Sequence, residues 1–197
     1  MYKVVGTVTS RAFRVIWMLE ELGEPYELIE AGPNSPGILE FNPTGKIPAL
    51  IDGDAVLVDS TAIITYLGDK HGALTHRAGS LERAAQDALM NTVLDEIDGS
   101  LWTAARFSRV LPEDYRSDAM LPGLAWEFER NLDRLSQRLV GPCLQGETFT
   151  IVDIVLTHCL GWAGSVGFPK PDDRLRSYAR DMRARPAFQK ARQASAG

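Results

Sequence analysis

The 197-residue chain has few cysteines and histidines, which limits the kinds of site it can carry. Its two cysteines, Cys143 and Cys159, stand too far apart for a Cys-x-x-Cys redox pair and fit no zinc spacing. The three histidines are scattered, so no metal-binding cluster is indicated. We expect both cysteines to be reduced and structural, because free cysteine commonly behaves as a small buried residue.

The sequence also lacks a long apolar run and an excess of positive charge. No stretch approaches the ~20 apolar residues of a membrane-spanning helix, and the N-terminus M-Y-K-V-V-G-T-V is typical of a first strand rather than a signal peptide. The net charge of -5 argues against nucleic acid or an anionic membrane as the main partner. We therefore expect a cytoplasmic protein that binds neither.

Hydrophobic periodicity divides the chain into two parts. The first part alternates short strands and helices, with strands at 4–6, 26–29, 49–52 and 55–58, helices at 11–22 and 60–71, and at most one helical turn near 38–41. After a polar connection at 73–79 only helices are indicated, at 81–107, 121–140, 151–163, 175–184 and 188–194. The predicted fold is an α/β thioredoxin-like domain at residues 1–74, followed by an all-α helical bundle domain at residues 80–197.

One helix of the second part, at 151–163, is apolar nearly all round. A helix with so little polar surface is expected at the centre of a bundle. Its start is marked by Thr150-x-x-Asp153, which has the form of a capping box. The cap predicts where the helix begins and says nothing by itself about function.

The most informative stretch is N-P-T-G-K-I-P-A-L-I-D-G-D-A-V-L-V-D-S, from Asn42 to Ser60. Pro48 cannot donate to a sheet ladder, so it is expected at a strand start, where the peptide before it is free to face a ligand. A tight turn then returns the chain to Asp59 and Ser60 at a helix N-terminus, a position that favours a bound carboxylate. Together these features predict a seat for a small peptide-like ligand with an anionic end.

G-K-I-P-A-L followed by D-S resembles the glutathione-binding core of the cytosolic glutathione transferases. The cap of the apolar helix and R-P-A-F near the C-terminus are also similar to that family, specifically to bacterial, theta- or zeta-like members of the serine type. The resemblance implies that glutathione, a co-substrate rather than a tightly bound cofactor, is held by Lys46, Ile47, Pro48, Asp59 and Ser60. It implies a cis Pro48 with the Ile47 main chain paired to the cysteinyl backbone. Lys46 would then meet the glycyl carboxylate, Asp59 the ammonium and Ser60 the carboxylate of the γ-glutamyl group.

The catalytic residue must stabilise the thiolate of glutathione. Lowering a thiol pKa of about 8.5 by two units takes about 2.7 kcal/mol, and a hydrogen bond to a charged group supplies roughly 1.5–3 kcal/mol. The resemblance implies that Ser10 donates this bond if the chain is theta-like and Thr9 if it is zeta-like. Arg11 would add positive potential. Ser10 is also a natural N-cap, and the two roles are compatible.

The resemblance implies a glutathione S-transferase that conjugates the thiolate to a small hydrophobic electrophile in detoxification. The electrophile would meet Trp102, Arg106, Phe107 and Tyr115, and the protein would form a homodimer in which Asp95 reaches a partner's ligand. The same thiolate could serve a glutathione-dependent isomerase, peroxidase or dehalogenase. A non-catalytic interaction or regulatory protein of the same fold is the alternative from another class.

Overall fold

The computed structural model describes residues 1–195, which form two compact units. Unit 1 contains residues 1–78 together with the segment from Met182 onward, and unit 2 contains residues 79–181. Within residues 1–195 no helix has both the length and the apolar character needed to cross a bilayer.

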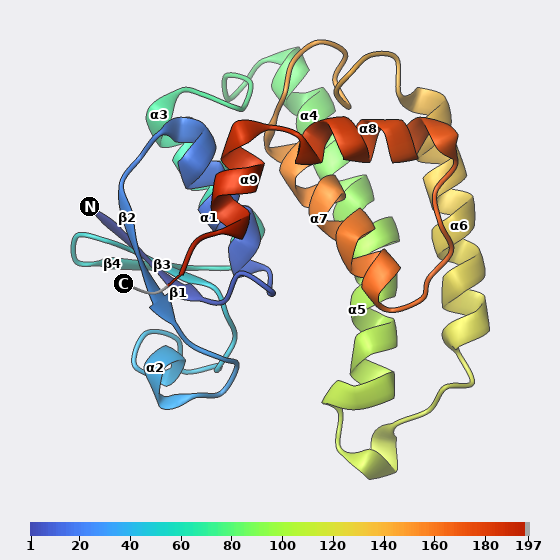
Figure 1. The fold of residues 1–197 in the computed structure, drawn as a ribbon, viewed down its shortest axis with the longest axis horizontal. Helices are drawn as coiled ribbons and strands as arrows, with labels where there is room; N and C mark the ends of the chain where they lie inside the picture. Colours follow the sequence, from blue (N-terminus) through green and yellow to red (C-terminus); the bar gives the residue numbers. More distant parts are fainter. Residues whose placement is uncertain (196–197) are drawn as a thin grey trace. The chain divides into compact units, whose positions relative to one another are not determined.

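Unit 1 is built on a four-stranded sheet whose strands lie in the order β2-β1-β3-β4. The strands are β1 (Tyr2–Gly6), β2 (Tyr26–Glu30), β3 (Ala49–Asp52) and β4 (Ala55–Val58). β1 runs parallel to β2 and antiparallel to β3, which pairs with β4 in a hairpin. In Figure 1, helices α1 (Ala12–Leu22) and α3 (Ser60–His71) lie above the sheet and the short α2 (Pro36–Leu39) lies below it. The predicted thioredoxin-like order is confirmed.

Helix α1 owes its place to one strongly apolar face. Val15, Ile16 and Leu19 have no exposed surface, and the helix ends at Gly23, whose φ of 70° is readily adopted only by glycine. The helix thereby covers the buried core of the sheet and directs its N-terminus toward the end of β1.

A last helix of unit 1, α9 (Pro186–Arg192), packs against α1. Phe188 meets the rings of Phe13 and Trp17 edge-on, with centroid separations of 5.1 and 4.9 Å. The sequence pattern predicts one helical domain at residues 80–197. In the structure α9 instead belongs to unit 1, because its apolar face completes the core around α1.

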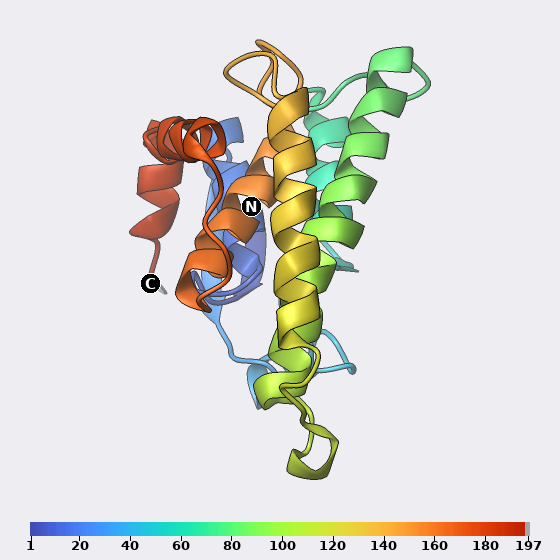
Figure 2. The ribbon, with the colours of Figure 1, turned by 90° about the vertical axis from the view of Figure 1, so that its right-hand side faces the viewer.

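Unit 2 is all helical (Figure 2). Its first long helical run, predicted as one helix at 81–107, is divided into α4 (Leu81–Thr92), the π-helical η1 (Val93–Asp98), α5 (Gly99–Ala105) and the π-helical η2 (Arg106–Val110). The one-turn η3 (Glu113–Tyr115), α6 (Leu121–Arg138), α7 (Ile151–Ser165) and α8 (Asp173–Arg183) follow. The predicted all-helical second part is confirmed.

The predicted central helix corresponds to α7, most of which is buried. Thr150 and Asp153 form the capping box, and the Asp153 carboxylate also accepts hydrogen bonds from Leu144 N at 2.9 Å and Tyr178 Oη at 2.8 Å. Burial nevertheless raises the pKa of Asp153. Asp153 therefore ties the loop before α7 and helix α8 to the start of the central helix.

Both cysteines are buried thiols, and neither forms a disulfide bond. Cys159 on α7 donates to Oδ1 of Asp98 at 3.4 Å. Among residues 1–195, no three His, Cys, Asp or Glu side chains are grouped so as to hold a metal ion.

Candidate functional site

The site begins where β1 gives way to α1. A Cβ atom on Gly6 would lie 2.6 Å from the Cβ of Ala12 and 3.7 Å from that of Ile47. Real Cβ atoms do not approach so closely, so only glycine allows the strand end, the helix start and the turn before Pro48 to converge. Sequence analysis missed this residue, although a glycine between a predicted strand and helix was a usable signal.

Ser10 lies in the turn that leads from Gly6 into α1. Its Oγ donates to the carbonyl of Thr7 at 2.8 Å and accepts from the backbone N–H of Ala12 at 3.1 Å. Thr9 is exposed, and its Oγ1 lies 3.2 Å from Oγ1 of Thr7. The structure thus places the Ser10 hydroxyl on the backbone N–H of Ala12, the first residue of α1, with Arg11 as the N-cap.

The loop before β3 is held by a buried asparagine that sequence analysis did not single out. Asn42 is 6% exposed and donates from Nδ2 to the carbonyl of Lys46 at 2.8 Å. Its Oδ1 accepts from the backbone N–H and the hydroxyl of Thr44, at 3.2 and 2.8 Å. The loop leads into a cis Ile47-Pro48 bond. Because the ladder of β3 begins at Ala49, the Ile47 peptide lies outside it.

The acid-serine pair lies at the start of α3, as the motif predicts. Asp59 is the N-cap, and its Oδ1 accepts from the N–H groups of Thr61 and Ala62 at 2.9 and 3.0 Å. Asp59 is exposed, whereas Ser60 is only 2% exposed. The Oγ of Ser60 accepts from Nη1 of Arg14 at 3.4 Å, which links the pair to α1.

The residues predicted to meet the electrophile belong to unit 2. Trp102 lies on α5, and Arg106 and Phe107 lie together on η2, with the guanidinium carbon 5.7 Å from the Phe107 ring centre. Ser117 N donates to the carbonyl of Phe107 at 3.1 Å, which returns the η3 loop to η2. Tyr115 on that loop is 70% exposed. These four residues therefore lie in the part of unit 2 that runs from α5 to η3.

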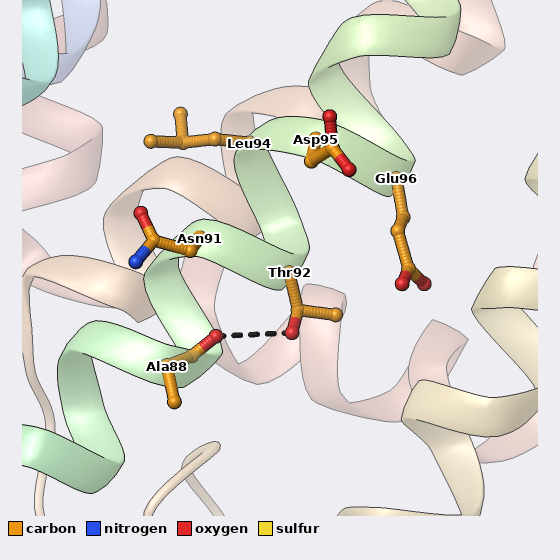
Figure 3. Close-up of a pocket in the computed structure, with 6 residues that line it drawn as sticks. All are labelled: Ala88, Asn91, Thr92, Leu94, Asp95 and Glu96. Atoms are coloured by element: carbon orange, nitrogen blue, oxygen red, sulfur yellow. Dashed lines mark hydrogen bonds between the residues drawn. The ribbon is translucent and has the colours of Figure 1, made fainter.

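Unit 2 also carries an open surface depression along α4 and η1 (Figure 3). It is lined by Ala88, Asn91, Thr92, Leu94, Asp95 and Glu96. The Thr92 hydroxyl donates to the carbonyl of Ala88 at 3.0 Å. None of the predicted glutathione-binding residues lines this depression.

The fold places the chain in a class of proteins that combine a thioredoxin-like unit with a helical unit. Residues 6–75 match the family model described as glutathione S-transferase, N-terminal domain. Glutathione S-transferase 1 of Zea mays is 38% identical over 109 residues, a match that covers 52% of this chain and 49% of that protein. A probable glutathione S-transferase of Oryza sativa subsp. japonica is 27% identical over 203 residues, covering 94% of this chain and 92% of that protein.

The similarity extends over the whole chain in a comparison with a solved structure. The theta class glutathione S-transferase from Xanthomonas axonopodis pv. citri, crystallised with glutathione bound, aligns with a TM-score of 0.79 and 26% identity. The alignment covers 100% of this chain and 99% of that one. In sequence and in fold the chain is therefore similar to glutathione S-transferases.

Proposed function

We propose that this protein is a glutathione transferase that conjugates the thiolate of glutathione to a small hydrophobic electrophile. One observation carries the proposal. A single unit contains a hydroxyl on the N-terminus of α1, a cis-proline turn beside it, and an acid-serine pair on the N-terminus of α3. A tripeptide with a central thiol and charged ends matches these three features. The similarity to a structure with glutathione bound supports the assignment.

The binding mode follows from the chemistry of each group. The γ-glutamyl end is a zwitterion and requires both signs of charge within contact distance. Asp59 supplies the negative charge for the ammonium, because its second carboxylate oxygen is not used by the helix cap. Ser60 donates its hydroxyl and its backbone N–H to the carboxylate. The Ile47 main chain next to Pro48 pairs with the cysteinyl backbone, and exposed Lys46 meets the glycyl carboxylate.

We assign thiol activation to Ser10 rather than Thr9. The Ser10 hydroxyl lies on the N-terminus of α1, where the helix adds about 0.3–1 kcal/mol toward an anion. Rotation of its proton from the Thr7 carbonyl to the sulfur supplies the donor, and Arg11 adds positive potential. This assignment corresponds to the serine type and to a theta-like member.

The electrophile is assigned to the aromatic groups of unit 2, Trp102, Phe107 and Tyr115, with Arg106 beside them. A homodimer in the cytoplasm is part of the same proposal. Isomerase, peroxidase and dehalogenase reactions use the same thiolate, so a panel of electrophiles, peroxides and haloaromatics separates these activities.

The test is to compare binding and chemistry in matched variants. Calorimetry is expected to show glutathione binding to the wild type, and the thiolate absorbance of bound glutathione is expected to titrate below the pKa of the free thiol. Ser10→Ala is expected to raise that pKa and reduce conjugation by at least about tenfold with little change in affinity. Thr9→Ala serves as the matched hydroxyl control. No heat with glutathione would favour the non-catalytic module, and an equal loss of binding and conjugation would remove Ser10 from the chemistry.

A further inference from the structure

Helix α1 contains an arginine in the interior of unit 1. Arg14 is 1% exposed, and Nη1 of its guanidinium lies 3.4 Å from Oγ of Ser60, which is itself 2% exposed. A buried arginine retains its charge, because its pKa is far above the physiological range. A charge is costly to bury unless it is paired. Arg14 makes further interactions besides this one, and its hydrogen bond to Ser60 joins α1 to the start of α3.

The chemistry of the two groups fixes the direction of this hydrogen bond. A guanidinium has donors and no acceptor, so the Ser60 oxygen accepts and its own proton is left for another partner. Within residues 1–195 the Ser60 hydroxyl makes no other hydrogen bond. Buried hydroxyl groups are nearly always satisfied, so an acceptor from outside the chain is expected here.

We propose that Arg14 is a positioning residue that presets the Ser60 hydroxyl as a donor to the γ-glutamyl carboxylate. This inference rests on the proposed binding of glutathione at Asp59 and Ser60. Arg14 holds the acceptor side of the hydroxyl and places a positive charge behind it, which strengthens the outward bond to an anion. Ser10 lies in the turn that leads into α1, and Arg14 lies on the first turn of that helix, so the start of α1 would hold the thiol and the γ-glutamyl end together.

The test uses two ligands that differ only in this carboxylate. Glutathione is compared with γ-aminobutyryl-cysteinyl-glycine, which lacks the α-carboxylate, by calorimetry on the full chain. The wild type is expected to prefer glutathione by about tenfold or more, as a charge-assisted hydrogen bond allows. Arg14→Gln is expected to remove most of this preference by weakening glutathione alone. Lys3→Gln, which removes an exposed positive charge from the same unit, is the matched control and should keep the preference.

A double-mutant cycle shows whether Arg14 acts through Ser60. In a Ser60→Ala background, Arg14→Gln is expected to cause little further loss of glutathione affinity. Arg14→Lys keeps the charge and one donor, so it is expected to retain part of the preference. It also replaces Arg14→Gln as the test if circular dichroism shows that variant to be unfolded.

Two results would overturn the positioning role: an unchanged preference in a folded Arg14 variant, or equal weakening of both ligands. Wild-type protein that binds neither ligand would instead refute the proposed function itself.

Discussion

Gly6 shows how one missing side chain permits three segments to meet. An added methyl group at this position would lie 2.6 Å from the Cβ of Ala12, where α1 begins. We expect Gly6→Ala to destabilise unit 1 by about 1–3 kcal/mol, as overpacking does, and to weaken glutathione binding because the start of α1 is displaced. Chemical denaturation and calorimetry measure the two effects. Gly32→Ala is the control, because a Cβ on Gly32 meets nothing within 4 Å. Equal effects of the two substitutions would exclude the close contact as the cause.

Asp59 combines a structural role with a proposed ligand role, and two substitutions separate them. Its φ of 70° is tolerated by asparagine, which can also accept the cap hydrogen bonds of α3. We expect Asp59→Asn to change the stability by less than about 0.5 kcal/mol, and Asp59→Ala to cost about 1 kcal/mol or more through the lost cap.

Both Asp59 variants are expected to lose glutathione affinity, because neither supplies a charge for the ammonium. Thermal melts and calorimetry of the pair measure the two roles. Wild-type affinity in a stable Asp59→Asn protein would show that the carboxylate is only a cap.

Pro48, Asp59 and Ser60 could be predicted because they belong to one short motif, in which the residues that define the site are close together in the sequence. Arg14 was missed because its role depends on a contact across the fold, with Ser60 at the start of α3. Asn42 was missed although its partners Thr44 and Lys46 are close in the sequence, because the burial of a loop residue is decided by the fold. From the sequence, an arginine in an amphipathic helix is expected to be exposed. Only the structure shows that Arg14 is buried and contacts Ser60 at the start of α3. The buried asparagine likewise reads as an ordinary loop residue.

The long helical run of unit 2 is an element whose internal structure the periodicity did not reveal. Apolar spacing predicted one helix, whereas η1 and η2 are π-helical. A π-turn inserts one residue into a helix and is rare, so a short sequence window averages over it. Arg106 and Phe107 both lie on η2, so two of the four residues proposed to meet the electrophile are on the irregular part of the run.

The start of α8 gives a pH-dependent prediction. Hydrogen bonds from the backbone N–H of Leu175, at 2.9 Å, and then from the Ser136 hydroxyl, at 2.6 Å, lower the pKa of Asp172. A depressed folded-state pKa stabilises the protein above the unfolded pKa of about 3.9, and this stabilisation is lost as the pH falls through the folded value.

We therefore expect the difference in unfolding free energy between wild type and Asp172→Asn to be present at pH 6 and to shrink below about pH 4. Urea denaturation across this range measures it. Asp173→Asn, on the neighbouring exposed carboxylate, is the control for a general charge effect. A difference that stays constant down to pH 2 would show that the ionised carboxylate contributes nothing.

At the scale of the whole molecule, the order of strands and helices was predictable because each element has its own period and its own stop signals. The sequence did not predict which unit each element packs with. The sequence pattern of α9 is that of any amphipathic helix. Its apolar face is buried against α1, and only the folded structure shows this contact. The ion pairs that accompany it, Arg185 with Glu21 and Lys190 with Glu20, join residues far apart in the sequence.

This arrangement makes unit 1 depend on the end of the chain. Phe188 fills the space beside Phe13 and Trp17, and removing a buried phenylalanine ring typically costs about 3–5 kcal/mol. We expect Phe188→Ala to lower the stability of unit 1 by this order. A chain that stops after Ala184 should lose more, because the ion pairs with Glu20 and Glu21 go as well.

Trp17 reports on this loss directly. It has no exposed surface and is the one tryptophan of residues 1–78, the other three lying in unit 2. In a protein whose Trp102, Trp126 and Trp162 are replaced by phenylalanine, truncation after Ala184 is expected to shift the emission to longer wavelength and to lower the urea midpoint. Gln193→Ala, at the exposed C-terminal end of α9, should leave both unchanged. If the truncated chain kept the wild-type emission and midpoint, the core around α1 would be complete without α9. Because the Ser10 hydroxyl accepts a hydrogen bond from the backbone N–H of Ala12 at the start of α1, a looser α1 should reduce glutathione affinity in step with the emission shift.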